Sequence, residues 1–105
     1  MVIMDWNSLS NTAIVSEIGK RLKEYRLKKK LSQQDLAERA GISLFTIAQI
    51  EKGKPVSIGM LLPVMRVLRL LDNLELLLPE IGPSPIEMMK LKGRMPQRIR
   101  LKKAL

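Results

Sequence analysis

Apolar residues recur at helical spacing in successive segments along most of the chain, and a good N-cap residue precedes each of these segments. In the first segment, apolar positions follow one another at intervals of three or four: Ile14, Ile18, Leu22 and Tyr25. That interval places them on one face of a helix, and we expect this stripe to be buried. A first helix is therefore predicted from Ser10 or Asn11, both good N-cap residues, to about Lys29.

Residues 31–53 (LSQQDLAERAGISLFTIAQIEKG) predict two short helices joined by a tight turn. Ser32 followed by Asp35 is a start of the capping-box type, in which the two residues satisfy each other's backbone amides. Gly41 is placed to end the first helix, since glycine adopts the left-handed conformation at low cost. A three-residue turn between two helices of about eight residues is typical of a DNA-binding helix-turn-helix.

The second of these helices is expected to start at Ser43 and to end near Gly53. Ile47 and Ile50 fall on its inner face. The outer face is then made by the residues that remain: Ser43, Leu44, Phe45, Thr46 and Gln49.

A fourth helix is predicted from a cap at Ser57 to about Leu70, with an obstacle at Pro63. A proline past the first turn removes a hydrogen bond and crowds the carbonyl four residues earlier. We therefore expect either a kink near Gly59 or a helix whose regular part begins at Pro63.

The segment after this helix is unusually aliphatic. Asp72 can cap a fifth helix from Asn73 to Leu78, and 14 of the 22 residues between Met60 and Ile81 are aliphatic. A domain of this size cannot cover so much apolar surface alone, which favours a homodimer face, although helix 5 could instead simply close the core. The expected dimer face comprises Leu70, Leu71, Leu74, Leu77 and Leu78.

The C-terminal segment has a different character. Ser84-Pro-Ile-Glu combines a cap, a proline at the first helical position and an acidic third residue, and so predicts a short sixth helix over residues 85–91. Residues 94–105 are basic and are expected to be mobile in isolation. The fold class is thus all-α, with an N-terminal arm at residues 1–9, a helical domain at 10–81, and a short helix with a basic tail at 82–105.

Composition limits the chemistry. The chain has no cysteine and no histidine, so the commonest metal ligands and general bases are missing, and no metal site, cofactor or enzymatic activity is expected. Residues 1–89 carry 12 Lys and Arg against 10 Asp and Glu, whereas residues 90–105 carry seven basic residues and no acid. Basic fields of this kind attract polyanions such as nucleic acid or an acidic partner surface.

The N-terminus lacks the basic start and long apolar run of a signal peptide, and the uncharged stretch Pro55–Met65 is about half as long as a membrane span. We therefore expect no membrane association and a soluble, cytoplasmic protein.

The outer face of the second short helix carries no charge before Glu51, so it can enter a major groove without repelling phosphates. Gln49 can hydrogen-bond a base edge, best of all adenine, and Leu44, Phe45 and Thr46 can touch thymine methyl groups or sugars. Phe45 could alternatively be a core or partner contact. Four further residues are candidates for phosphate contacts because they or their amides flank this helix in sequence: Gln33, Gln34, Lys54 and Ser57.

The segment RLKEYRLKKKLSQQDLAERAGISLFTIAQIEKGK resembles the lambda-repressor-like, or xenobiotic-response-element, helix-turn-helix family, over about Ile14 to Leu70. The resemblance implies five helices, a homodimer on a palindromic operator in double-stranded DNA, and transcriptional repression. It also implies that Arg26 pairs with Glu51, that Leu44, Phe45, Thr46 and Gln49 read bases, and that Gln33 is the helix 2 glutamine. The chain departs from the family pattern at Leu44, Phe45 and Pro63.

The later segment DNLELLLPEIGPSPIEMMKLKGRMPQRIRLKK is similar to the tail of HipB-type antitoxins, whose partner is a HipA-type serine/threonine kinase toxin. This implies an autorepressor that also restrains a toxin. The alternatives are a stand-alone transcriptional regulator, or a protein-interaction adaptor in which Leu44 and Phe45 bind a protein.

Overall fold

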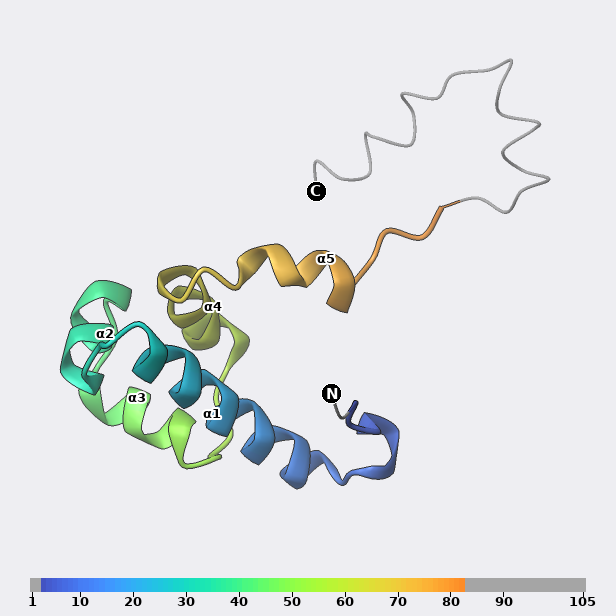
Figure 1. Cartoon of the computed structure of the whole chain (residues 1–105), viewed down its shortest axis with the longest axis horizontal. Coiled ribbons are helices and arrows are strands. Elements are labelled where there is room, and N and C mark those ends of the chain that lie inside the picture. Colours follow the sequence, from blue (N-terminus) through green and yellow to red (C-terminus); the bar gives the residue numbers. More distant parts are fainter. Residues whose placement is uncertain (1–2, 83–105) are drawn as a thin grey trace, which may run out of the picture. The chain divides into compact units, whose positions relative to one another are not determined.

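The computed structural model describes residues 3–82, and within this range it is entirely helical, with no strand (Figure 1). The α-helices are α1 (Asn11–Lys28), α2 (Gln33–Ala40), α3 (Leu44–Glu51), α4 (Ile58–Val67) and α5 (Leu74–Leu77), with 3-10 helices at Trp6–Ser8 and Leu71–Asn73. The all-α prediction with five helices is confirmed for this part. The predicted sixth helix and basic tail lie outside the described residues. The chain divides into two units, one up to Leu74 and one from Glu75 onward.

The four longer helices all begin in the same way. In each, the hydroxyl of a serine N-cap accepts a hydrogen bond from the backbone amide three residues later, at 3.0 to 3.3 Å. The caps are Ser10, Ser32, Ser43 and Ser57. The structure therefore confirms the predicted starts, because each hydroxyl satisfies an amide that has no partner within the helix.

These helices also end alike. Just past each one a residue takes the left-handed conformation, with φ between 59° and 86°: Lys30, Gly41, Gly53 and Arg69. The next amide donates to the carbonyl five residues back in all four cases, to Arg26, Ala37, Gln49 and Met65 respectively. Glycine is the usual residue at such an end, so the sequence marked the ends of α2 and α3 more clearly than those of α1 and α4.

The core of the first unit is a small aliphatic cluster that joins α1, α2, α3 and α4. Its buried members are Leu22, Leu36, Ala37, Ile47, Ile50, Val64 and Leu68. Ile47 and Ile50 of α3 are 1% and 4% exposed, as their inward positions predicted. The opposite face of α3 is consequently directed away from the core.

The buried stripe of α1 differs from the predicted one. Ile18 and Tyr25 are 38% and 44% exposed, and the buried residues are Gly19, Leu22 and Arg26. Helix α1 packs against α3 through Gly19, because a Cβ atom at this position would overlap the Ile50 carbonyl oxygen. The close approach of two backbones, rather than an apolar side chain, defines this part of the inner face.

Helix α4 begins at Ile58 and carries Pro63 in its interior, so of the two alternatives a helix that begins at Pro63 is wrong. The helix ends at Val67, three residues before the predicted end. Asp72 is not a helix cap, since it lies within the 3-10 helix that precedes α5. The 3-10 helix takes up Asn73, the first residue of the predicted fifth helix, and α5 ends one residue before the predicted end, at Leu77.

The N-terminal arm forms a 3-10 helix at Trp6–Ser8. Its contact with α1 is a cation–π interaction, in which the Arg21 guanidinium lies 4.8 Å from the centre of the Trp6 ring. Arg21 also donates to the Glu17 carboxylate at 2.9 Å.

Candidate nucleic-acid interface

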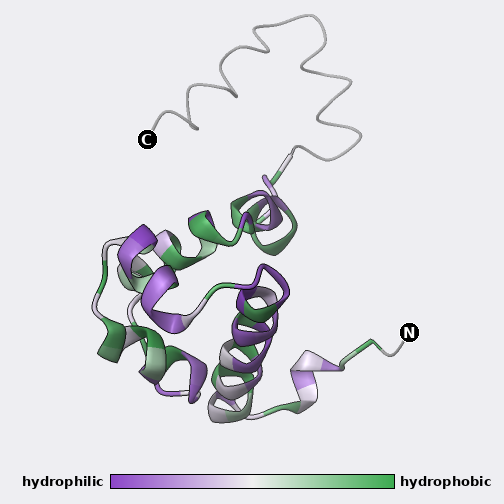
Figure 2. Ribbon diagram, turned by 60° about the vertical axis from the view of Figure 1, so that its left-hand side comes forward, coloured by the Kyte–Doolittle hydropathy of each residue, from purple (hydrophilic) through white to green (hydrophobic). Residues whose placement is uncertain are grey.

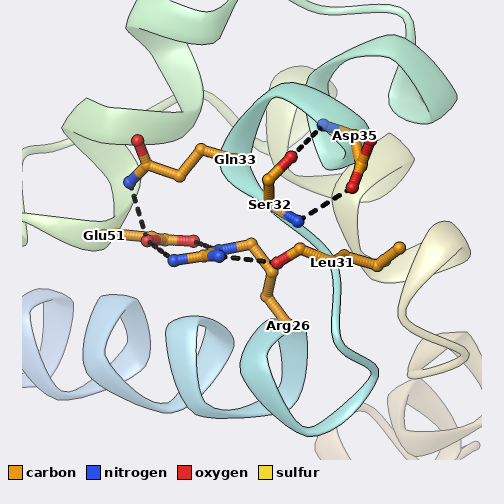
Figure 3. A network of polar contacts seen from close by, with 6 residues as sticks. All are labelled: Arg26, Leu31, Ser32, Gln33, Asp35 and Glu51. Atoms are coloured by element: carbon orange, nitrogen blue, oxygen red, sulfur yellow. Dashed lines mark hydrogen bonds and ion pairs between the residues drawn. The ribbon is translucent and has the colours of Figure 1, made fainter.

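A polar network fixes the C-terminal end of α3 against α1 and α2 (Figure 3). The Arg26 guanidinium donates to both oxygens of the Glu51 carboxylate, through Nε at 2.7 Å and through a terminal nitrogen at 3.1 Å. Its other terminal nitrogen donates to the Leu31 carbonyl oxygen at 2.7 Å. The Arg26 and Glu51 side chains are 7% and 5% exposed. The pair that the family resemblance implies is therefore a buried, bidentate ion pair.

Gln33 completes this network. Its side-chain amide donates to Glu51 Oε1 at 2.9 Å, so the first residue of α2 is tied to the last residue of α3. Glu51 therefore accepts three hydrogen bonds, from two other helices. The turn between α2 and α3 is thus closed by a polar contact as well as by the aliphatic core.

The start of α2 carries the predicted capping box (Figure 3). The Ser32 hydroxyl accepts from the Asp35 amide at 3.0 Å, and the Asp35 carboxylate accepts from the Ser32 amide at 3.0 Å. The Ser32 backbone amide stabilises the charged form, so the pKa of Asp35 lies below its ordinary value of 3.8.

The face of α3 that points away from the core is apolar at its N-terminal end. Leu44 and Phe45, the first two residues of the helix, are 44% and 71% exposed. The hydropathy colouring of α3 turns hydrophilic only towards its C-terminal end (Figure 2). Phe45 is therefore not a core residue, so the alternative of a core contact is wrong.

The polar groups on this face differ in how far they are already engaged. The hydroxyls of Ser43 and Thr46 are hydrogen-bonded to each other at 2.8 Å, and the Ser43 hydroxyl also caps the helix. Within residues 3–82, the side-chain amide of Gln49 makes no hydrogen bond. Gln49 is thus the polar side chain of α3 with its full set of donors and acceptors available.

The candidate phosphate contacts are distributed over three elements. Gln33 has one amide hydrogen engaged by Glu51, and Gln34 donates to Glu38 at 3.0 Å. Lys54 is exposed in the loop after α3, and its amide donates to the Gln49 carbonyl at 3.0 Å. Ser57 caps α4. The contacts of Gln33 and Lys54 thus link these two residues to α3, whereas Gln34 and Ser57 make their contacts within their own helices.

The leucines of the expected dimer face are divided between the two units. In the first unit, Leu70 packs partly against the core, which leaves less of it for a partner, and Leu71 and Leu74 are half-buried. In the second unit, Leu77 and Leu78 are 68% and 75% exposed.

The segment that contains the helix-turn-helix and the buried ion pair is similar to a known family of proteins. Residues 22–71 match a helix-turn-helix family model. The match runs from within α1 to the 3-10 helix before α5, so it includes both halves of the helix-turn-helix (α2 and α3) and the Arg26–Glu51 pair. It supports a DNA-binding transcriptional regulator. No curated protein matches the chain.

Within the described part of the chain, no helix combines the length and the apolar character that a membrane span needs. In the same range, no three acidic side chains come together in a way that could hold a metal ion.

Two contacts that position the interface were not predicted from the sequence. Gln33 was expected at a phosphate, and its hydrogen bond to Glu51 depends on the fold, which brings the two ends of the helix-turn-helix together. Gly19 was overlooked because it has no side chain, although its spacing of three and seven residues from Leu22 and Arg26 fits the inner face of α1.

Proposed function

We propose that the protein is a homodimeric, sequence-specific DNA-binding repressor that places α3 in the major groove. The observation that carries this proposal is the arrangement of α3. Its uncharged outer face is exposed at the N-terminal end, while its C-terminal end is held by the buried Arg26–Glu51 pair. The N-terminal residues of a recognition helix reach base edges, so the exposed Leu44 and Phe45 are placed at the bases, and Gln49 follows Phe45 one turn along the helix.

Base discrimination is assigned to Gln49. Its unengaged amide can donate and accept together, which matches the N6 and N7 groups of adenine. A bidentate contact of this kind discriminates against the wrong base by about 1–3 kcal/mol. Gln49→Ala should therefore reduce the preference for the operator over unrelated DNA by roughly 5- to 150-fold, with little change in affinity for unrelated DNA.

The measurement is fluorescence anisotropy with a duplex from the region upstream of the protein's own gene and with a scrambled duplex of equal composition. Gln34→Ala is the matched control, because Gln34 is a glutamine assigned to phosphate, and phosphate contacts carry no sequence information. An equal loss on both duplexes for Gln49→Ala would contradict the reading role. Absence of binding to either duplex by the unmodified protein would favour an adaptor that uses Phe45 on a protein surface.

Dimerisation is assigned to the leucines near the end of the described chain. Leu77 and Leu78 are more than two-thirds exposed, and apolar side chains in such a cluster favour a partner surface. Two recognition helices about one duplex turn apart would then meet successive major grooves of a palindromic site.

Leu77→Glu should shift the sedimentation coefficient from dimer towards monomer. Leu27→Glu places the same charge at an exposed leucine of α1 and should leave the dimer intact. A monomeric unmodified protein that still binds the operator would contradict this assignment.

The antitoxin role is the most specific part of the proposed function, and it rests on the sequence similarity of residues 72–103 to the tails of HipB-type antitoxins. It requires a HipA-type kinase as partner and repression of the operon that encodes both proteins. Co-expression with a kinase-like product of an adjacent reading frame should yield a complex that co-purifies. If no such frame adjoins the gene, or if its product does not bind, the protein acts as a stand-alone regulator.

A further inference from the structure

The N-terminal end of α3, which would face the bases, exposes apolar side chains. The edges of the bases in the major groove are mostly polar. Leu44 and Phe45 are 44% and 71% exposed at the first two positions of the helix. A major groove contains one apolar group that projects from the base edges, the C5-methyl group of thymine. Contact of these two side chains with the donors and acceptors of the base edges would desolvate polar atoms without replacing their hydrogen bonds.

The polar residues of α3 limit further which bases this helix can recognise. Guanine presents acceptors that are best met by Arg or Lys, and cytosine presents a donor that is best met by Asp or Glu. From Leu44 to Ile50 α3 has none of these residues. Glu51, its only acidic residue, is 5% exposed at the side chain and is occupied by Arg26 and Gln33.

The hydroxyls of Ser43 and Thr46 do not replace the missing contacts to guanine and cytosine. Ser43 and Thr46 are bonded to each other at 2.8 Å, so the two hydroxyls together keep one free hydrogen. Gln49 remains as the group able to make a bidentate polar contact, and that contact suits adenine. The face as a whole is therefore matched to A·T pairs, with the methyl group read by hydrocarbon and the adenine read by the amide.

We propose that Phe45, assisted by Leu44, is a specificity determinant that recognises the C5-methyl group of pyrimidines in the major groove. Both thymine and 5-methylcytosine carry this group at the same ring position, so both fit the proposed contact. The inference rests on the proposed DNA-binding function and adds to it the chemical group that is read.

The test begins with a duplex selected by the protein from a pool with a random central segment. The selected duplex is then synthesised with deoxyuridine in place of each thymidine in turn, which removes one methyl group and changes no hydrogen-bonding group of the base. Burying one methyl group contributes about 0.8 kcal/mol, so uracil at a contacted position should weaken binding about fourfold. Uracil at positions outside the contact should leave the affinity unchanged.

The second arm distinguishes thymine from the methyl group itself. A contacted T·A pair is replaced by C·G, which should weaken binding, and the cytosine is then replaced by 5-methylcytosine. Recovery of about fourfold on methylation would show that the methyl group is recognised in either base. No recovery, together with a uracil effect, would restrict the contact to thymine and overturn the wider claim.

Variants connect the effect to the residue. Phe45 is largely exposed, so Phe45→Ala should keep the melting temperature while abolishing the difference between thymine and uracil at one position per half-site. Leu27→Ala truncates an exposed side chain of α1 and should preserve that difference. A thymine–uracil difference that survives in both Phe45→Ala and Leu44→Ala would overturn the proposal.

Sequence-specific binding and methyl recognition would be contradicted by different results. If the selection yields no preferred sequence, the proposed sequence-specific function is wrong. If it yields a preferred sequence whose uracil version binds equally well at every position, sequence-specific binding stands and methyl recognition is wrong.

Discussion

Replacement of Arg26 by methionine tests the buried network most directly. Methionine has a similar length and no charge, so Arg26→Met removes both bonds to Glu51 and the bond to the Leu31 carbonyl oxygen. The Glu51 carboxylate then stays buried with Gln33 as its remaining side-chain donor. The variant therefore measures the cost of an uncompensated charge rather than the net contribution of an ion pair.

The expected cost follows from the burial of the two side chains, which are 7% and 5% exposed. Removing one partner of a pair this deeply buried destabilises a protein by about 3–5 kcal/mol. A domain of this size has a free energy of unfolding of about 5–10 kcal/mol, so the loss is a large fraction of the total. The melting temperature should fall by at least about 10 °C, because 1 kcal/mol corresponds to about 4–8 °C in a domain of 60–100 residues.

The measurement is urea unfolding followed by circular dichroism, at one fixed protein concentration because dimerisation would affect the apparent stability. Arg21→Met is the matched control, since it breaks a solvent-accessible pair with Glu17 in the same helix together with the cation–π contact to Trp6, and it should cost about 2 kcal/mol or less. Arg26→Met/Glu51→Leu removes both charges and should recover much of the loss. Equal costs for Arg26→Met and Arg21→Met, or a double variant as unstable as the sum of its single variants, would refute the reasoning.

Other positions offer independent tests. Gly19→Ala should lower the free energy of unfolding by about 1–3 kcal/mol, because the new methyl group meets the Ile50 carbonyl. Gly59→Ala in α4 makes only an ordinary van der Waals contact, with the Ser57 hydroxyl oxygen at 3.9 Å, and should not destabilise the protein; equal effects would contradict the close α1–α3 contact. Asp35 has a lowered pKa in the folded state, so its contribution is present above pH 3.8 and is lost as the pH falls through the folded-state pKa. The stability difference between the unmodified protein and Asp35→Ala, measured by urea unfolding over a pH series, should thus shrink at acidic pH, and a difference that grows would contradict the assignment.

The starts of the helices were predictable because they depend on local chemistry. A serine hydroxyl and the amide three residues later lie in the same short segment, so no knowledge of the rest of the fold is needed. Ser32, Ser43 and Ser57 cap α2, α3 and α4 as the sequence predicts. The inward positions of Ile47 and Ile50 were equally accessible, since they follow from helical spacing once the start is known.

The inner face of α1 was less accessible, and the error has a physical cause. Apolar periodicity selected Ile18 and Tyr25, which lie next to the residues that are in fact buried, Gly19 and Arg26. Glycine contributes no hydrophobicity, and arginine counts as polar unless its partner is known. A face built from a backbone contact and a buried ion pair therefore has no apolar signature of its own.

The end of the described chain was predicted with the correct helical class but with the wrong boundaries. Asp72 resembles a cap in sequence, yet the backbone turns with 3-10 geometry at Leu71–Asn73 and leaves α5 with four residues. The choice between a 3-10 turn and an α-helical start depends on packing, which a local pattern of leucine and aspartate does not specify.

The polar network that holds α3 lies at its C-terminal end, and this has a consequence for how substitutions act at a distance. Leu44 lies seven positions before Glu51, which corresponds to about 10 Å of helix. A tilt of about 5° at the C-terminal end would therefore move Leu44 and Phe45 by roughly 1 Å, which is enough to weaken their packing against a group in the groove. Changes in α1 that never touch DNA, such as those at Gly19 or Arg26, can thus alter which sequence is bound while the bases are still read by the same side chains.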